Sequence, residues 1–329
     1  MASASQLKAL VQSYVDGDDD RFLSVALQVA AHEARLGHGK LATELREAID
    51  EAKRRRGAAS LVSISKPRGE LANLLQVSQP SERLSGLILH PTLSRQIERV
   101  IREQRAATSI LEQGLSPRRK LLFVGPPGTG KTLTASVLAG ELGLPLLQVR
   151  LDGLITRFMG ETAAKLRQIF DATGRMRGIY LFDEFDAIGS GRGLANDVGE
   201  IRRVVNSFLM MIEQDSSRSL VIAATNHPSI LDRALFRRFD DVLHYDLPDA
   251  DRAAKLLETR LSSKAAPQVC WEALGKEACP LSHAEITRAA DEALKDVLIR
   301  GEKECVEADI RAMLEERKAV AARLPEGTS

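Results

Sequence analysis

The residues best placed to do chemistry form a glycine-rich loop. It fits the pattern G-x-x-x-x-G-K-[ST], and its residues are Gly125, Pro126, Pro127, Gly128, Thr129, Gly130, Lys131 and Thr132. The glycines let the backbone curl so that N–H groups point at phosphate oxygens, and the dipole of a following helix adds positive charge. In this pattern the lysine reaches the outer phosphates, and the last hydroxyl ligates Mg²⁺. The loop therefore predicts a site for ATP and Mg²⁺.

The segments on either side of the loop support this prediction. The apolar run Lys120–Val124 precedes the loop, and a second apolar segment, Leu133–Leu142, follows it. A strand before the loop and a helix after it are the context that the motif requires. We include Leu133, the first residue after the motif, among the candidate nucleotide-binding residues.

A second candidate group is acidic. The run Ile179–Phe182 predicts a buried strand, and it ends in Asp183 and Glu184. In enzymes with a phosphate-binding loop, a carboxylate at such a strand end holds the Mg²⁺ shell. We therefore predict that Asp183 binds Mg²⁺ together with Thr132, and that Glu184 polarises the attacking water as a general base.

The elements that must position these residues alternate along the chain. Short apolar runs separated by helical segments predict an α/β fold with a five-stranded parallel sheet and helices on both faces. The predicted strands are Lys120–Val124, Leu146–Arg150, Gly178–Phe182, Leu220–Thr225 and Val242–Tyr245. The predicted domains are a small helical N-terminal domain over 1–56, a linker over 57–83, the α/β domain over 84–248 and a C-terminal helical lid over 249–329.

Composition narrows the function classes. The net charge is +1 and aromatic residues make up 4% of the chain, which argues against nucleic acid as a partner. The three cysteines, Cys270, Cys279 and Cys305, show no CxxC spacing, so they indicate neither a disulfide framework nor a zinc site. No apolar run is long enough to span a membrane. We therefore predict a cytoplasmic protein without a membrane span.

The acidic stretch also carries a family resemblance. The run Tyr180–Ile188, Y-L-F-D-E-F-D-A-I, resembles the second acidic motif of the AAA ATPases that include katanin, spastin, the proteasomal ATPases and the membrane-anchored AAA proteases. The resemblance covers residues 84–300 and not the first 80. It implies an ATPase that hydrolyses ATP to ADP and phosphate.

The resemblance assigns further catalytic residues. Asn226, at the end of the strand Leu220–Thr225, matches the polar residue that orients the lytic water. Arg237 and Arg238 match the arginine fingers, which stabilise charge on the nucleotide of a neighbouring subunit. They are adjacent here, whereas the family usually separates them, so either could be the main finger. Fingers that act in trans imply a homo-oligomeric ring, and the family implies six subunits.

Two other segments match the family in part. Phe158, Met159 and Gly160 resemble the pore loop that grips a polypeptide in the central channel of the ring. His283 and Ala284 lie where the family lines the adenine and ribose, but His283 replaces a glycine. Its ring could stack on the adenine or cap the following helix.

The preferred function is ATP-driven remodelling of a protein substrate threaded through the pore. The N-terminal domain would recruit the substrate or an adaptor, and a separate protease could be a partner. One alternative is a loader or initiator that acts on nucleic acid. Another is a regulatory switch in which ATP sets a conformation for partner binding.

Overall fold

The structure is a computed structural model, and it describes residues 19–35, 37–40, 42–47, 49, 67, 69–154, 159–185, 198–228 and 236–323. The chain divides into two compact units, Met1–Leu61 and Val62–Ser329. In the first unit, helix α2 spans Asp19–Arg35, and residues 42–47 are also helical. None of the described helices combines the length and the apolar character that a membrane-spanning helix needs.

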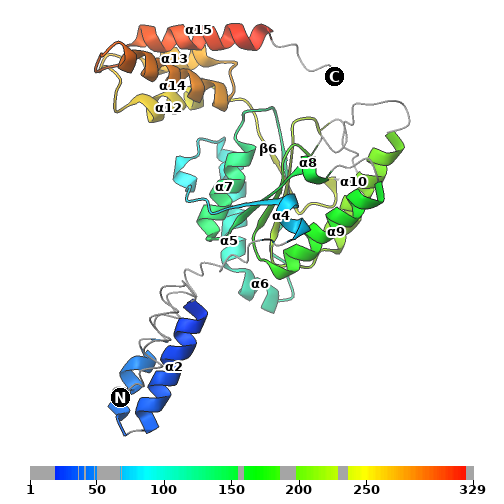
Figure 1. Ribbon diagram of the computed structural model, residues 1–329. Helices are drawn as coiled ribbons and strands as arrows, with labels where there is room; N and C mark the ends of the chain where they lie inside the picture. The colour runs from blue at the N-terminus through cyan, green and yellow to red at the C-terminus, as the bar shows by residue number, and fades with distance from the viewer. Residues whose placement is uncertain are drawn as a thin grey trace. The chain divides into compact units, whose positions relative to one another are not determined.

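The second unit contains a six-stranded sheet (Figure 1). Its strand order is β1-β3-β4-β5-β2-β6. All pairs are parallel except β1 with β3. The strands are β1 (Leu75–Ser78), β2 (Lys120–Val124), β3 (Leu146–Val149), β4 (Ile179–Phe182), β5 (Leu220–Thr225) and β6 (Asp241–His244). The α/β fold with a parallel central sheet is thus confirmed.

Helices cover both faces of this sheet. Helix α4 (Glu70–Leu74) precedes β1, and the elements between the strands are η1 (Leu84–Gly86), α5 (Pro91–Arg105), α6 (Ala107–Glu112), α7 (Lys131–Leu142), α8 (Leu151–Leu154), α9 (Met159–Arg175) and α10 (Val198–Gln214). Strand residues alternate between two apolar clusters, as a side-chain period of two requires. In β2, Leu122 and Val124 pack with α9 and α10, whereas Leu121 and Phe123 pack with α5 and α7.

A helical lid follows the sheet. It consists of α12 (Ala250–Leu261), α13 (Trp271–Ala278), α14 (His283–Ile299) and α15 (Glu307–Arg323). The lid has its own apolar core, in which Leu257, Leu274 and Ile286 are fully buried. The predicted C-terminal helices are therefore present.

Strand β1 corrects two predictions. The sheet has six strands rather than five, and residues 70–78, which we assigned to a linker, form α4 and β1. Leu75 is buried and Val77 packs against the core, whereas Gln76 and Ser78 are exposed. An edge strand of four residues with one apolar face has no continuous apolar run, so its pattern is too short to recognise. Residues 91–112 form two helices, α5 and α6, which meet at Ala106.

Candidate functional site

Strand order brings the predicted catalytic residues together. Strands β4, β5 and β2 are neighbours and parallel, so their carboxyl ends lie at one edge of the sheet. The glycine-rich loop follows β2, Asp183 and Glu184 follow β4, and Asn226 follows β5. We call this the carboxyl edge. Open α/β sheets bind their ligands at such an edge.

The loop has the backbone that a phosphate cradle needs. Gly128 has a φ of 73°, in the left-handed region that glycine adopts at little cost. A Cβ on Gly125 would lie 2.1 Å from the carbonyl oxygen of Tyr245, so that position has no room for a side chain. Helix α7 begins directly at Lys131, which points the positive end of its dipole at the loop.

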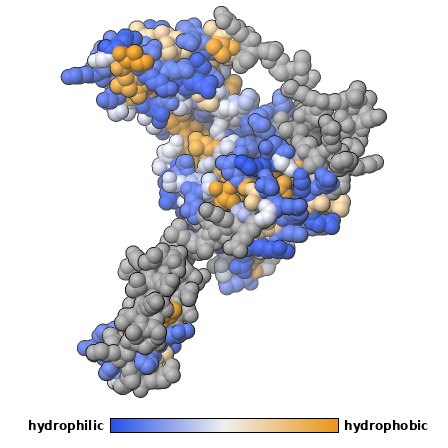
Figure 2. All heavy atoms as spheres, viewed as in Figure 1, coloured by the Kyte–Doolittle hydropathy of each residue, from blue (hydrophilic) through white to orange (hydrophobic). Residues whose placement is uncertain are grey.

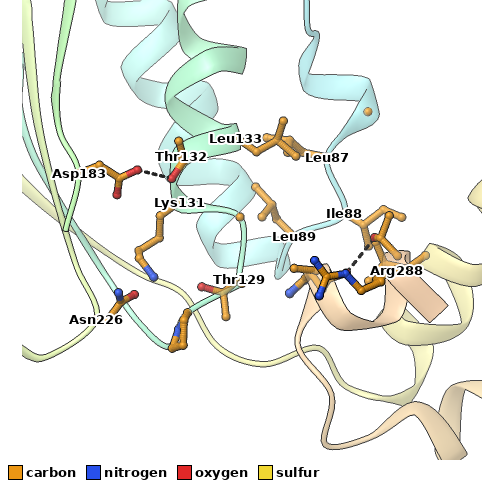
Figure 3. A pocket seen from close by; sticks show the side chains of 18 of the residues that line it. Leu87, Ile88, Leu89, Thr129, Lys131, Thr132, Leu133, Asp183, Asn226 and Arg288 are labelled. Carbon is orange, nitrogen blue, oxygen red and sulfur yellow. Dashed lines mark hydrogen bonds between the residues drawn. The ribbon is translucent and has the colours of Figure 1, made fainter. Parts of the chain in front are cut away.

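Lys131 is largely buried beneath this loop. Its Nζ donates hydrogen bonds of 2.8 Å to the carbonyl oxygens of Gly125 and Pro126. Thr129 is also buried, and its hydroxyl donates to the Pro126 carbonyl over 2.8 Å. Figure 3 shows the Lys131 side chain extending along the loop on the side where Asn226 lies. These contacts hold the ammonium group at the base of the loop, within reach of a bound phosphate.

The residues predicted to bind Mg²⁺ are in contact. The Thr132 hydroxyl donates to Oδ2 of Asp183 over 2.6 Å (Figure 3). A hydroxyl and a carboxylate are the hard oxygen ligands that Mg²⁺ prefers, and this ion usually takes only one or two protein ligands besides phosphate and water. The described residues hold no cluster of three or more His, Cys, Asp or Glu side chains suited to a metal. The pair therefore fits a Mg²⁺ ion that arrives with a nucleotide.

Glu184 has a strained backbone. Its φ is 49°, whereas left-handed conformations cost a residue with a side chain about 1–2 kcal/mol. Its N–H donates to Oδ1 of Asp183 over 3.0 Å, which stabilises the turn. Its side chain is exposed beside the Mg²⁺ pair. Strain of this kind is often retained where it directs a functional side chain.

A cavity of about 600 Å³ lies between the loop and the lid. Its volume is in the range of small-ligand sites. Helix α14 docks on the loop, because the Ala284 N–H donates to the Gly128 carbonyl over 3.0 Å. The cavity is lined by Gly86, Leu87, Ile88, Leu89, Pro127, Gly128, Thr129, Gly130, Lys131, Thr132, Leu133, Asp183, Glu184, Asn226, Leu256, His283, Ala284, Thr287, Arg288 and Asp291.

His283 lies within this cavity and does not cap its helix. The capping group is the Ser282 hydroxyl, which accepts from the Glu285 N–H over 3.3 Å. Both ring nitrogens of His283 are buried, and neither makes a hydrogen bond of good geometry among the described residues, although the Ile88 backbone lies near the ring. Burial and the nearby Arg252 lower the pKa of His283, while the Ile88 backbone and Asp249 oppose this shift. The ring is therefore a neutral imidazole at pH 7.

The arginine pair lies elsewhere. Arg237 and Arg238 precede β6, whose first residue pairs with Leu121 of β2. Arg238 Nε is 3.2 Å from Glu213 Oε2 at the end of α10, and Arg237 is exposed. Strand β2 has five residues, which at about 3.3 Å per residue separate this amino edge from the glycine-rich loop by roughly 15 Å. These arginines are thus not part of the chain's own cavity.

Other predicted residues are described only in part. Phe158 lies outside the described residues. Met159 and Gly160 are the first two residues of α9, and the structure describes their backbone only. The pore-loop prediction therefore stays a prediction.

Sequence reasoning missed several residues of the lid. Thr287 and Asp291 line the cavity from the two turns of α14 that follow the predicted residue His283, and Arg288 lines it as well. The spacing i, i+4, i+8 places these residues on one helix face. That periodicity was the available signal, but it does not show which way a polar face points.

Comparisons with known proteins agree with this geometry. Residues 121–247 match the AAA family, described as "ATPase family associated with various cellular activities". The chain is 36% identical over 333 residues to "Uncharacterized AAA family ATPase y4kL" of Sinorhizobium fredii, covering 98% of this chain and 99% of that protein. It is 37% identical over 198 residues to "ATP-dependent zinc metalloprotease FtsH 3" of Sphaerobacter thermophilus, covering 58% of this chain and 40% of that protein.

A third relative is also named as a zinc metalloprotease. The chain is 33% identical over 222 residues to "ATP-dependent zinc metalloprotease FtsH" of Acidimicrobium ferrooxidans, and it covers 34% of that protein. The two metalloproteases are thus matched over well under half of their length, whereas the Sinorhizobium ATPase is matched almost throughout. The chain belongs to the AAA family of ATPases.

Proposed function

We propose that this ATPase is a protein remodeller that works as a homo-oligomeric ring, with six subunits as the expected number. The observation that carries the proposal is the separation of the two halves of the catalytic machinery. The carboxyl edge holds the nucleotide and Mg²⁺ residues, whereas Arg237 and Arg238 lie at the amino edge. Only a neighbouring copy can present these arginines to the nucleotide.

Within one subunit, we assign the roles as follows. Lys131 and the loop N–H groups bind the phosphates, Thr132 and Asp183 bind Mg²⁺, and Glu184 and Asn226 position the attacking water. The backbone strain at Glu184 and the contact between Thr132 and Asp183 support these roles.

The purine base would lie between the lid and residues 86–89. Leu87 and Leu133 both line the cavity (Figure 3) and offer an apolar surface to a planar base. A buried polar atom without a partner costs about 1–3 kcal/mol. The Ile88 backbone approaches the His283 ring, so at least one of the two ring nitrogens is left for a ligand to bond.

Coupling to a polypeptide would run through the start of α9. Phe158, Met159 and Gly160 would face the channel of the ring, where an aromatic ring can wedge between substrate side chains without reading their sequence. The two FtsH relatives are named as metalloproteases, and this chain contains no His-Glu-x-x-His motif of the kind that binds their metal. A separate protease or an adaptor bound by residues 1–56 remains part of the proposal, as does a cytoplasmic location.

The test uses a fluorescent protein that carries an unstructured tail. Phe158→Ala should hydrolyse ATP at close to the wild-type rate but fail to unfold the tagged protein. Phe158→Tyr, which retains an aromatic ring, should unfold it. Wild-type unfolding by Phe158→Ala would reject the pore assignment. Hydrolysis by the wild-type protein without any effect on the tagged protein would favour the regulatory switch.

A further inference from the structure

A second cavity lies beside α9 and α10, at the amino edge of the sheet. It has a volume of about 880 Å³ and shares no residue with the nucleotide cavity. It is formed by the second half of α9, the end of α10 and the segments that lead into β4 and β5. It is lined by Ala163, Arg167, Phe170, Asp171, Thr173, Gly174, Arg175, Arg177, Ser207, Met210, Met211, Gln214, Asp215, Ser216, Ser217 and Arg218.

The cavity has a local excess of positive charge. Four exposed arginines line it: Arg167, Arg175, Arg177 and Arg218. In the part of the chain that the structure describes, none of the four forms an ion pair. The chain as a whole carries a net charge of only +1, so this excess is a feature of the site.

The carboxylates of the cavity do not neutralise these arginines. Asp215 forms an ion pair with Arg119, and it also accepts from the hydroxyls of Thr173 over 2.8 Å and Ser217 over 3.1 Å. Its negative charge is therefore already matched. Among the described residues of the lining, Asp171 is the other carboxylate, so one unmatched carboxylate accompanies four arginines.

The same contacts make the wall rigid. The Asp215 hydrogen bonds connect the segment after α10 to the end of α9, and the Ser219 hydroxyl donates to the Thr173 carbonyl over 2.8 Å. Rigid walls reduce the entropy lost on binding. Arg218 follows this segment directly, and Arg177 precedes β4, so both are held near fixed strand ends.

Helix electrostatics explains only one of the arginines. Arg175 lies in the last turn of α9, where a cation complements the helix dipole. Arg177 and Arg218 lie outside helices, and Arg167 lies in the middle of α9. A solvated helix end therefore does not account for the cluster.

The remaining lining indicates the class of ligand. Met210 is 57% exposed, and Met211 and Phe170 lie beside it in the lining. Methionine adapts its shape to different apolar partners. Guanidinium groups bind carboxylates through paired hydrogen bonds. Hydrophilic residues cover most of the described face in Figure 2, and apolar residues form smaller patches on it.

Nucleic acid fits the site less well than peptide. Phe170, the only aromatic residue in the lining, packs at 5.9 Å from Phe182 and 5.6 Å from Phe208, measured between ring centroids. Its ring is thus partly buried against the core, which limits the surface it offers for base stacking.

We propose that this cavity binds a short acidic peptide segment of a partner protein, with its carboxylates paired to Arg175, Arg177 and Arg218 and an apolar side chain placed on Met210. The volume suits a few side chains rather than a folded domain. The contact is therefore small, and binding should be weak and reversible.

The test is fluorescence polarisation with a labelled peptide of alternating Glu and Leu. The full-length protein should bind this peptide, and added salt should weaken binding because the pairs are exposed. The triple variant Arg175→Gln/Arg177→Gln/Arg218→Gln should lose affinity by at least about tenfold. Met210→Gln should also weaken binding, by about two- to fivefold, because it removes apolar contact.

Controls separate this site from general electrostatics. Arg99→Gln removes an exposed charge from α5 and should leave binding unchanged. Basal ATP hydrolysis and the thermal unfolding midpoint should be the same in the triple variant and the wild type, since the substituted residues are exposed. The proposal is overturned if the acidic peptide does not bind or if Arg99→Gln weakens it as much as the triple variant. It is also overturned if a single-stranded oligonucleotide competes more strongly than the peptide.

Discussion

The two edges of the sheet differ in how completely one chain builds them. At the carboxyl edge, three adjacent strand ends deliver Lys131, Asp183 and Asn226 to one cavity, and hydrogen bonds hold the lysine and the aspartate in place. At the amino edge, Arg238 is held by Glu213, whose side chain is 63% exposed. Exposed ion pairs of this kind contribute about 0–1 kcal/mol. One chain thus gathers the predicted nucleotide residues in one cavity, and under the proposed function its arginines act on the nucleotide of another copy.

The largest expected effect comes from a substitution in the phosphate-binding loop at the carboxyl edge. Lys131→Ala should abolish ATP binding, because the buried ammonium is the positive charge beneath the phosphate loop. Titration with a fluorescent ATP analogue measures this, and an affinity within a few-fold of wild type would contradict the assignment. Lys295→Ala, which removes an exposed lysine from α14, is the matched control and should bind normally.

Substitutions of the arginines at the amino edge should lower ATP hydrolysis without changing ATP binding. Arg237→Ala and Arg238→Ala, made separately, should each bind ATP as the wild type does. The variant that lacks the main finger should lose about 10³–10⁵ in turnover, which is the range for arginine fingers. A steady-state phosphate-release assay identifies that residue. If Arg237→Ala were a monomer and bound ATP more weakly than the wild type, Arg237 would instead belong to the nucleotide site of its own chain.

Glu184→Gln should separate binding from turnover within the carboxyl edge. Loss of the general base should lower hydrolysis by about 10²–10⁴, while ATP still binds. Light scattering of this variant should show a ring of about six subunits with ATP and smaller species with ADP. The same mass with both nucleotides would remove the link between the γ-phosphate and assembly.

The smallest expected effect concerns the lid. His283→Gln should weaken ATP binding by about two- to tenfold, because one hydrogen bond contributes about 0.5–1.5 kcal/mol. Isothermal calorimetry measures the ATP affinity of His283→Gln. Thr287→Val, a second change on the same helix face, serves as the comparison. Equal affinities for wild type and His283→Gln would exclude a contact with the base.

The lowered pKa of His283 also predicts a pH dependence of stability. Between the lowered pKa of His283 in the folded chain and the pKa of about 6.5 of an unfolded histidine, the unfolded chain binds more protons than the folded one, so the free energy of unfolding rises with pH. Stability should therefore fall as the pH drops below about 6.5, by at most about 1.4 kcal/mol per pH unit from this residue. His283→Gln should show a shallower slope in nucleotide-free denaturant unfolding between about pH 5.5 and 7.5.

Much of this architecture could be predicted from the sequence because its signals are local. The runs Lys120–Val124 and Leu220–Thr225 match β2 and β5 residue for residue, since fully buried strands are continuous apolar runs. The glycine-rich loop is equally local. Strand β1 was missed because four residues of an edge strand give no clear pattern.

The arrangement of the two edges could not be predicted in the same way. It follows from β2 lying between β5 and β6, and that order depends on packing between residues far apart in the chain. The unpartnered nitrogens of His283 likewise become visible only when the lid is placed over the loop. The sequence alone left open whether this histidine caps its helix.

The central claim is that each nucleotide is hydrolysed with arginines from another copy, and a mixing experiment tests it directly. The Arg237→Ala/Arg238→Ala variant keeps its nucleotide site, and the Lys131→Ala variant keeps its arginines. Each should be inactive alone, and their mixture should recover ATP hydrolysis with a maximum at an intermediate ratio. A mixture that co-assembles by light scattering but stays inactive at every ratio would contradict the account.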